Sequence, residues 1–245
     1  MFRKTYDQIK SVQDSYFFYN NRRFLLKNYL NKISGQKQRL KILDLGTATG
    51  AMLDTLAGFG ATFGLDLSEY ALQTIKNKNC PLLRAGAEKL PFKSEVFDLV
   101  VIFDLLYHKD IRDEQRVVAE IYRVLKKGGS LLVTDSAFMH LYGRHDQAAQ
   151  GVRRFNKQEM INLLSAHNFK VIHFTYIYMV LFPLIWFKRR ILAKLINNKD
   201  VLELEFKETF QPLNLCCTWL FNFEFLLSQI LPLPFGVSFS CWAKK

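Results

Sequence analysis

Short apolar segments alternate with amphipathic segments from residue 40 to about residue 135. The segments KILDLG, ATFGLDLS, PLLRAGA, FDLVVIFDLL and SLLVTD have the length and residue types of strands. Helical periodicity is found in AMLDTLAGFG, in EYALQTIKNK after a capping Ser68, and in DEQRVVAEIYRVLKKGG, which we expect to end at its double glycine. Strands that alternate with helices predict a parallel α/β sheet that binds its ligand at the carboxyl ends of the strands.

The two ends of the chain differ from this regular part. Residues 1–35 include the aromatic segment SYFFYNNRRFLL and are expected to form a helical lid. Residues 179–233 are rich in apolar side chains but are interrupted by Glu224 and by prolines, and no stretch reaches the ~20 residues that a membrane-spanning helix needs. We therefore expect an α/β domain over residues 36–178, an apolar helical insertion over 179–233, and the final strand of the domain over 234–245.

The loop after the first strand restricts the ligand. A phosphate-binding P-loop is excluded, because Gly46 and Gly50 are too close together and Met52 stands where a lysine is required. A dinucleotide site requires G-x-G-x-x-G, and Asp44 next to a diphosphate would repel it. An acid here suits a ligand with an ammonium and a sulfonium but no phosphate, such as S-adenosylmethionine. Asp66 ends the next strand at the spacing of a ribose-binding acid, with a turn or helix cap as the alternative role.

Four motifs in order, ILDLGTATG, GLDLS, GAEKLPFKSEVFDLVVIFDLLYH and EIYRVLKKGGSLLVTD, resemble those of class I S-adenosylmethionine-dependent methyltransferases of the type 11-like group. The resemblance implies a Rossmann-like sheet of seven strands with an antiparallel last strand, S-adenosylmethionine as cofactor, and methyl transfer as activity. It also implies residues for the methionine end, the ribose, the adenine and the reacting methyl, in chain order: Asp44, Gly46, Thr47, Ala48, Gly50, Asp66, Leu67, Ala87, Glu88, Phe103 and Asp104.

The chain departs from the family pattern at several of these motifs. Ala48 replaces the middle glycine of the loop, and its methyl group narrows the loop. Gly86 replaces the aspartate that commonly grips the adenine amino group in relatives. Tyr107 stands where many relatives have glutamate, and Gly151 stands where a second histidine is common. We expect the changes at Ala48, Gly86 and Tyr107 to weaken cofactor binding without changing the identity of the ligand.

Candidates for acceptor chemistry come from the segment HLYGRHDQAAQGVRRFNKQEM and from the N-terminal helix. A neutral His145 beside Asp146 is a candidate general base, and His108 is a second one. Arg153 and Arg154 are candidates for binding an anionic group of the substrate, unless they pair with Asp146 as a structural staple. Substrate-binding roles are also expected for Tyr16 and Arg22 of the lid and for Tyr107, which follows the fourth strand. The alternative to a lid is an amphipathic helix that packs on the sheet.

The formal net charge of +12 favours anionic partners. Nucleic acid is not the preferred partner, because the cations lie near apolar segments and no amine-methylating Asn-Pro-Pro-aromatic signature follows the fourth strand. We expect a small, amphiphilic or lipid-linked acceptor that is methylated on oxygen or carbon. The alternatives are an RNA methyltransferase and a cofactor-binding protein of this fold that transfers no methyl group.

Location is predicted from the same features. The N-terminus has no apolar signal core, which predicts a cytoplasmic protein. The apolar run before residue 188 is followed by a basic cluster of Lys188, Arg189, Arg190 and Lys194, as in a helix that lies on an anionic membrane face. A hydrophobic cap over the substrate and a dimer interface are the alternatives. No histidine and acid cluster has the spacing of metal ligands.

Overall fold

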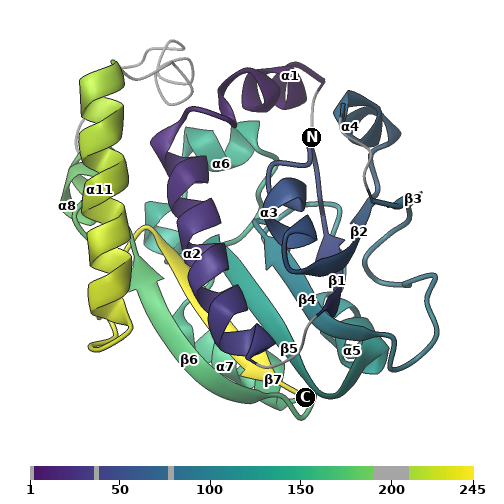
Figure 1. The fold of residues 1–245 in the computed structure, drawn as a ribbon. Coiled ribbons are helices and arrows are strands. Elements are labelled where there is room, and N and C mark those ends of the chain that lie inside the picture. Colours follow the sequence, from purple (N-terminus) through teal and green to yellow (C-terminus); the bar gives the residue numbers. More distant parts are fainter. Residues whose placement is uncertain (1–2, 36–38, 77–79, 190–209) are drawn as a thin grey trace.

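The computed structural model describes residues 3–35, 39–76, 80–189 and 210–245, and these form one seven-stranded mixed sheet covered by helices (Figure 1). The strand order is β3-β2-β1-β4-β5-β7-β6, and β7 is antiparallel to both of its neighbours. The strands are β1 (Leu40–Leu45), β2 (Gly60–Asp66), β3 (Leu82–Arg84), β4 (Phe97–Phe103), β5 (Leu125–Ser136), β6 (Lys170–Ile177) and β7 (Ser238–Lys244). The predicted Rossmann-like fold with an antiparallel last strand is confirmed.

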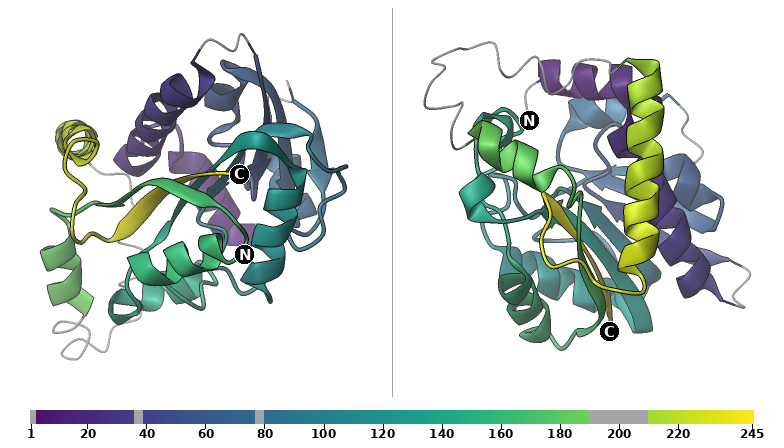
Figure 2. Two further views of the ribbon diagram at one scale, coloured as in Figure 1. Left: turned by 90° about the horizontal axis from the view of Figure 1, so that it is seen from below. Right: turned by 90° about the vertical axis from the view of Figure 1, so that its left-hand side faces the viewer.

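Helices cover both faces of the sheet, because successive strand side chains point to opposite faces. In β4, Leu99 and Val101 belong to one apolar cluster, whereas Val100 and Ile102 belong to the other. The first cluster is completed by α2 (Phe17–Ser34), α3 (Leu53–Ala57) and α11 (Gln211–Ser228), and the second by α5 (Glu114–Val124) and α7 (Lys157–Ser165). Figure 2 shows the two helical layers on either side of the strands.

Short helices surround the carboxyl ends of the parallel strands. They are α1 (Arg3–Val12), α4 (Glu69–Thr74), the 3-10 helix η1 (Met139–Leu141) and α6 (Arg144–Ala148). Ser68 caps α4 as predicted, since its hydroxyl accepts a hydrogen bond from the Ala71 amide at 3.2 Å. The buried Thr49 hydroxyl donates to Gln13, just after α1, and so joins the N-terminal helices to the loop after β1.

Two predicted helix boundaries are wrong. The helix expected over residues 51–60 is limited to α3, Leu53–Ala57. The helix expected to end at the double glycine ends at Val124 instead, and both glycines lie within β5. The cause is the end of the chain: the Gly128 amide donates to the Lys245 carbonyl, and the Lys245 amide donates to the Gly129 carbonyl. Gly128 has a φ of +73°, so this glycine pair forms an irregular strand start rather than a helix cap.

Between β6 and β7 the chain forms α8 (Phe182–Phe187) and α11, and α11 stands beside α2 at one edge of the molecule (Figure 1). Polar residues on the buried side of α11 hold it in place. Asn214 accepts from the Phe17 amide at 2.6 Å, at the start of α2, and the Glu224 carboxylate accepts from the Met179 and Val180 amides. Within the part of the chain that the structure describes, no helix combines the length and the hydropathy needed to cross a bilayer.

Candidate active site

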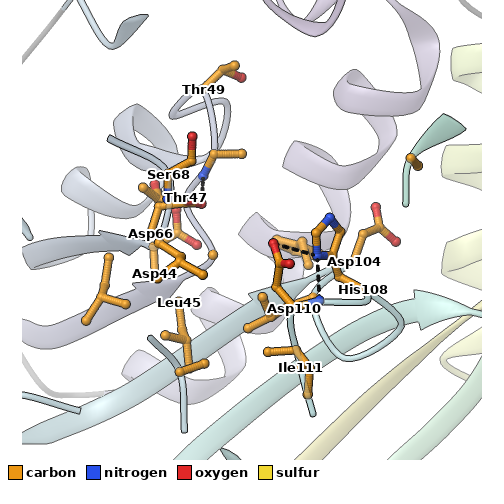
Figure 3. Close-up of a pocket in the computed structure, with 18 of the residues that line it drawn as sticks. Asp44, Leu45, Thr47, Thr49, Asp66, Ser68, Asp104, His108, Asp110 and Ile111 are labelled. Carbon is orange, nitrogen blue, oxygen red and sulfur yellow. Dashed lines mark hydrogen bonds and ion pairs between the residues drawn. The ribbon is translucent and has the colours of Figure 1, made fainter. Parts of the chain in front are cut away.

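A cavity of about 600 Å³ lies at the carboxyl ends of β1, β2 and β4. Its walls come from the loops after these strands, from α1 and α2, from residues 104–112, and from His145 and Ala149 of the α6 region. Figure 3 shows Asp44, Asp66 and Ser68 on one side of this cavity and Asp104, His108 and Asp110 on the other. The position agrees with the general rule for parallel α/β sheets.

The loop after β1 is shaped by residues with positive φ. Gly46 and Gly50 have φ values of +81° and +80°, which glycine adopts without strain. A Cβ at Gly46 would lie 3.0 Å from the Leu105 side chain, so this position has no room for a larger residue. Ala48 has a φ of +46°, where a glycine would be unstrained, and its amide donates to Asp66 at 2.9 Å. Gly46, Thr47 and Ala48 line the cavity, whereas Gly50 supports the loop from behind.

Two buried carboxylates lie side by side along the sheet at this wall. Asp44 accepts from the Thr47 hydroxyl at 2.7 Å, and burial raises its pKa to about 7, with a further contribution from the nearby Asp66. Asp66 accepts from the Ala48 and Ser68 amides at 2.9 and 2.8 Å, and burial raises its pKa as well. Carboxyl groups held at such a cost in desolvation are typical of a functional site, where a cationic or hydrogen-bond-donating ligand compensates them.

The predicted adenine wall contains one exposed apolar side chain and one open position. Leu67 lines the cavity with 51% of its surface exposed, and Ala87 lies opposite in the sequence-predicted place. Glu88 also lines the cavity, but its carboxylate accepts from the Arg112 and Asp113 amides at 2.7 and 2.9 Å. No atom lies within 4 Å of the position that a Cβ would take at Gly86, so the space that an aspartate fills in relatives is open.

These features fit S-adenosylmethionine. The cavity offers carboxylates and backbone groups with an exposed leucine next to them, and a volume in the range of ligand pockets. Its acids suit the ammonium and the ribose hydroxyls, and a diphosphate next to Asp44 and Asp66 would be repelled.

The opposite wall is formed by an ion pair between Arg22 of α2 and Asp104 at the end of β4. Arg22 is 3% exposed and stacks on the rings of Phe18 and Phe103, with its guanidinium carbon 4.0 and 5.5 Å from the two ring centres. Asp104 has a φ of +49°, and its amide donates to the Thr134 carbonyl at 2.9 Å. Arg22, Phe103 and Asp104 all line the cavity.

Both predicted base candidates, His108 and His145, line the cavity. Burial lowers the pKa of His108, and its Nδ1 accepts from the Asp110 amide at 3.2 Å. The neutral ring therefore carries its proton on Nε2 and has no spare lone pair while this bond is present. His145 is half-buried on α6, and its neighbour Asp146 is directed elsewhere.

Asp146, Arg153 and Arg154 lie outside the cavity lining. Asp146 is 1% exposed and accepts from Arg154 Nε at 2.9 Å, from the Gly143 amide at 2.8 Å and from Arg189 at 3.2 Å. Arg153 pairs with Glu114 of α5. This arrangement favours the structural staple, the alternative left open by the sequence, for Asp146 and Arg154, whereas Arg153 pairs with Glu114 instead of Asp146. It does not favour an Asp146–His145 dyad or an arginine clamp for the substrate.

Two departures from the family pattern meet in one contact. Tyr107 is 6% exposed, and a Cβ at Gly151 would lie 2.4 Å from its ring, so a residue larger than glycine cannot be accommodated there. The backbone of His108 pairs with that of Gly151 in an isolated antiparallel bridge. The tyrosine and the glycine therefore compensate for each other, and they hold the α6 loop against the segment after β4.

Several cavity residues were missed in the sequence, and one predicted residue lies elsewhere. Thr5, Tyr6 and Ile9 of α1 and Tyr19 of α2 line the cavity, and only the helical spacing of Tyr6 and Ile9 hinted at this. The segment Lys109–Arg112 also lines it. Tyr16 does not; it precedes α2 and packs on Phe17 with ring centres 4.4 Å apart. Arg190 and Lys194 of the predicted basic cluster lie outside the described residues.

The chain was compared with known proteins. Residues 43–133 match the model of the methyltransferase domain family. The ubiquinone/menaquinone biosynthesis C-methyltransferase UbiE of Psychromonas ingrahamii is 33% identical over a region that covers 44% of this chain and 47% of the relative. The chain therefore spans about half the length of the curated relatives that it matches.

Solved structures are similar over most of the chain. An S-adenosylmethionine-dependent methyltransferase of Mesorhizobium loti is 17% identical, with a TM-score of 0.57 over 95% of this chain and 100% of that one. A chain from the complex with the Haloferax volcanii Trm112 methyltransferase activator is 16% identical, with a TM-score of 0.63 over 98% of this chain and 94% of that one. Residues 43–133 thus match the methyltransferase domain family, in a chain with the fold of class I S-adenosylmethionine-dependent methyltransferases, and this match and fold together imply S-adenosylmethionine as the cofactor.

Proposed function

We propose that the chain transfers the methyl group of S-adenosylmethionine to an oxygen or carbon atom of a small amphiphilic or lipid-linked acceptor. The observation that carries the proposal is the pair of buried carboxylates, Asp44 and Asp66, in a cavity whose opposite wall is aromatic and cationic. When bound, S-adenosylmethionine supplies a methyl carbon that is already activated for in-line displacement. The protein then has to align the two reactants, which can contribute about 7–11 kcal/mol.

Each wall has a distinct role in this proposal. Asp44 binds the ammonium of the methionine end, and Asp66 accepts hydrogen bonds from the ribose hydroxyls while it holds the Ala48 amide in place. Leu67, Ala87 and Glu88 surround the adenine. The helices α1 and α2 form the lid, and the lid residues that reach the cavity are Thr5, Tyr6, Ile9, Tyr19 and Arg22.

The acceptor class is supported by a relative and by the molecular surface. The UbiE relative carries out C-methylation in ubiquinone and menaquinone biosynthesis, as its name states, which makes a quinone-like acceptor the first to test. The outward side of α8 and α11 carries a set of large exposed apolar side chains: Leu184, Trp186, Phe187, Leu213, Leu215, Trp219, Leu220, Phe223, Leu226 and Leu227. We call this set the apolar face.

The apolar face supports peripheral contact with a membrane. In α11 the buried side carries Phe221, Phe225 and Ser228, and the apolar face occupies the opposite side of the same helix. The only charged residue of α11, Glu224, is itself buried, so the exposed side has no charge to favour water. A helix whose exposed side is largely apolar favours a cover, and its outer position makes a lipid surface suitable (Figure 2).

The proposed activity is tested by incubating the protein with S-adenosylmethionine and a panel of hydroquinones and naphthohydroquinones. The expected result is S-adenosylhomocysteine formed in equal amount to a product that has gained one methyl group, measured by mass spectrometry. If the cofactor binds but no panel member is methylated, the quinone-like acceptor is rejected while the cofactor assignment stands.

A further inference from the structure

Arg22 has unused hydrogen-bond donors inside the cavity. The side chain is 3% exposed, and one of its terminal nitrogens, Nη1, pairs with Asp104. The other two guanidinium nitrogens, Nε and Nη2, are buried without a hydrogen-bond partner, and so is the hydroxyl of Tyr178 nearby. Leaving buried donors unpaired is costly in free energy, so the two Arg22 nitrogens, on a side chain that lines the cavity, indicate a ligand that pairs with them.

The electrostatic neighbours of Arg22 place it on the acceptor side. They are Asp104, Tyr19 and Tyr178, and Arg22 in turn acts on the buried Asp135 and on Tyr107. In Figure 3, Asp104 lies across the cavity from Asp44 and Asp66. The guanidinium therefore serves the space beyond the methyl group rather than the methionine end.

We infer that Arg22 and Asp104 form an acceptor subsite for a phenolate or enolate oxygen. The inference rests on the proposed function and specifies its substrate: the acceptor is an ionisable phenol or enol rather than an amine or an alcohol. The ring of Phe103, which lies beside the guanidinium and lines the cavity, also provides an apolar surface for a planar acceptor.

The charges balance in this arrangement. The acceptor hydroxyl gives its proton to the Asp104 carboxylate, and its oxygen becomes the anionic partner of Arg22 through Nε and Nη2, the donors that do not pair with Asp104. The acceptor then forms a bond to the methyl carbon through this oxygen or a conjugated carbon, while the carbon–sulfur bond breaks and its electron pair stays on sulfur. After attack through carbon, the methylated carbon loses its proton to water and the oxygen regains one, which restores the phenol or enol. The proton of Asp104 is released to water when the product leaves. The positive charge of Arg22 is thus balanced by an anion, first the Asp104 carboxylate and then the acceptor oxygen, until the methyl group is transferred.

The test measures binding of 4-nitro-1-naphthol, a phenol whose ionised form absorbs visible light. The protein is first loaded with sinefungin, a cofactor analogue that has an ammonium in place of the methyl sulfonium and cannot transfer a methyl group. We expect wild-type protein to bind the ionised naphthol and Arg22→Gln to bind it about tenfold more weakly or worse. Arg22→Lys should restore part of the affinity, because it keeps the charge with fewer oriented donors. Asp104→Asn should shift the pH at which the bound probe ionises.

The competing role for Arg22 is a contact with the methionine carboxylate of the cofactor. Binding of two adenosyl ligands, S-adenosylhomocysteine and methylthioadenosine, distinguishes this role from the acceptor subsite. Methylthioadenosine lacks the amino acid part, so its affinity reports only on folding and on the adenosine site. If Arg22→Gln weakens S-adenosylhomocysteine binding but leaves methylthioadenosine binding unchanged, Arg22 serves the cofactor and the inference is overturned. Unchanged naphtholate affinity overturns it as well. Failure of the wild-type protein to bind S-adenosylhomocysteine contradicts the proposed function itself.

Discussion

The two walls of the cavity, which we propose to bind the cofactor and the acceptor, are built in different ways. The cofactor wall consists of two neighbouring strand ends, and its central hydrogen bond joins residues 18 positions apart, Ala48 and Asp66. The acceptor wall joins Arg22 to Asp104, and its supporting bonds join segments much farther apart, such as Phe17 and Asn214 at a separation of 197 residues. The comparison teaches that the cofactor wall is a local property of one βαβ unit, whereas the acceptor wall depends on the whole fold.

The largest effect is expected at a buried ion pair of the α6 loop, outside the cavity lining. Replacing Asp146 by alanine leaves Arg154 buried without its anionic partner, and breaking such a pair costs about 3–5 kcal/mol. The measurement is the free energy of unfolding in urea. Glu69→Gln is the matched control: its pair with Arg84 has the same 2.8 Å separation, but both side chains are 60% exposed, and such a pair contributes about 0–1 kcal/mol. Equal losses in the two variants would contradict this difference in burial.

A smaller effect is expected at the cofactor wall. Asp66→Ala removes the acceptor for two ribose hydroxyls, and hydrogen bonds to charged groups contribute about 1.5–3 kcal/mol each. The affinity for S-adenosylhomocysteine should fall by about 100-fold or more, while the midpoint of thermal unfolding changes little, because the wall is local. Calorimetry measures the affinity; an unchanged value would remove Asp66 from the ribose site.

Next in size is the loss of membrane contact. Replacing Trp219 or Phe223 by serine removes a large apolar side chain from the apolar face, and burial of one such side chain is worth about 1.5–3 kcal/mol. Sedimentation with vesicles of phosphatidylglycerol and phosphatidylcholine should show at least about tenfold weaker binding. Val152→Ser, 49% exposed in the loop before α7, is the control and should bind as the wild type does. A wild-type protein that forms dimers and ignores vesicles would assign the face to self-association.

The smallest effect is a pH dependence at the cofactor wall. Because burial raises the pKa of Asp44 to about 7, the ligand-free protein favours the protonated carboxyl, and ionising it costs stability as the pH rises from about 4 to about 7. A ligand ammonium prefers the ionised form. The affinity for S-adenosylhomocysteine should therefore increase by up to about tenfold per pH unit below pH 7 and level off above it. Asp44→Asn should abolish this slope, and a slope that persists in the variant would assign it to another group.

The sequence predicted the fold and most of the cofactor wall, because periodicity, strand order and loop chemistry are local features. The end of α5 was misplaced, since the partner of Gly128 and Gly129 is Lys245, at the far end of the chain. The acceptor wall was only partly predicted. The sequence showed that Asp146 and two arginines are close along the chain, but the choice between a catalytic and a structural role depends on burial and on Arg189. That Tyr107 fills the space left by Gly151 is likewise visible only in three dimensions.

The most direct test of the account is a calorimetric titration of the wild-type protein with S-adenosylhomocysteine and, in parallel, with adenosine diphosphate. The carboxylates of the cofactor wall predict saturable one-to-one binding of the first ligand and no measurable binding of the second. Binding of the diphosphate in preference to the adenosyl ligand, or of neither, would contradict the assignment of this cavity to S-adenosylmethionine.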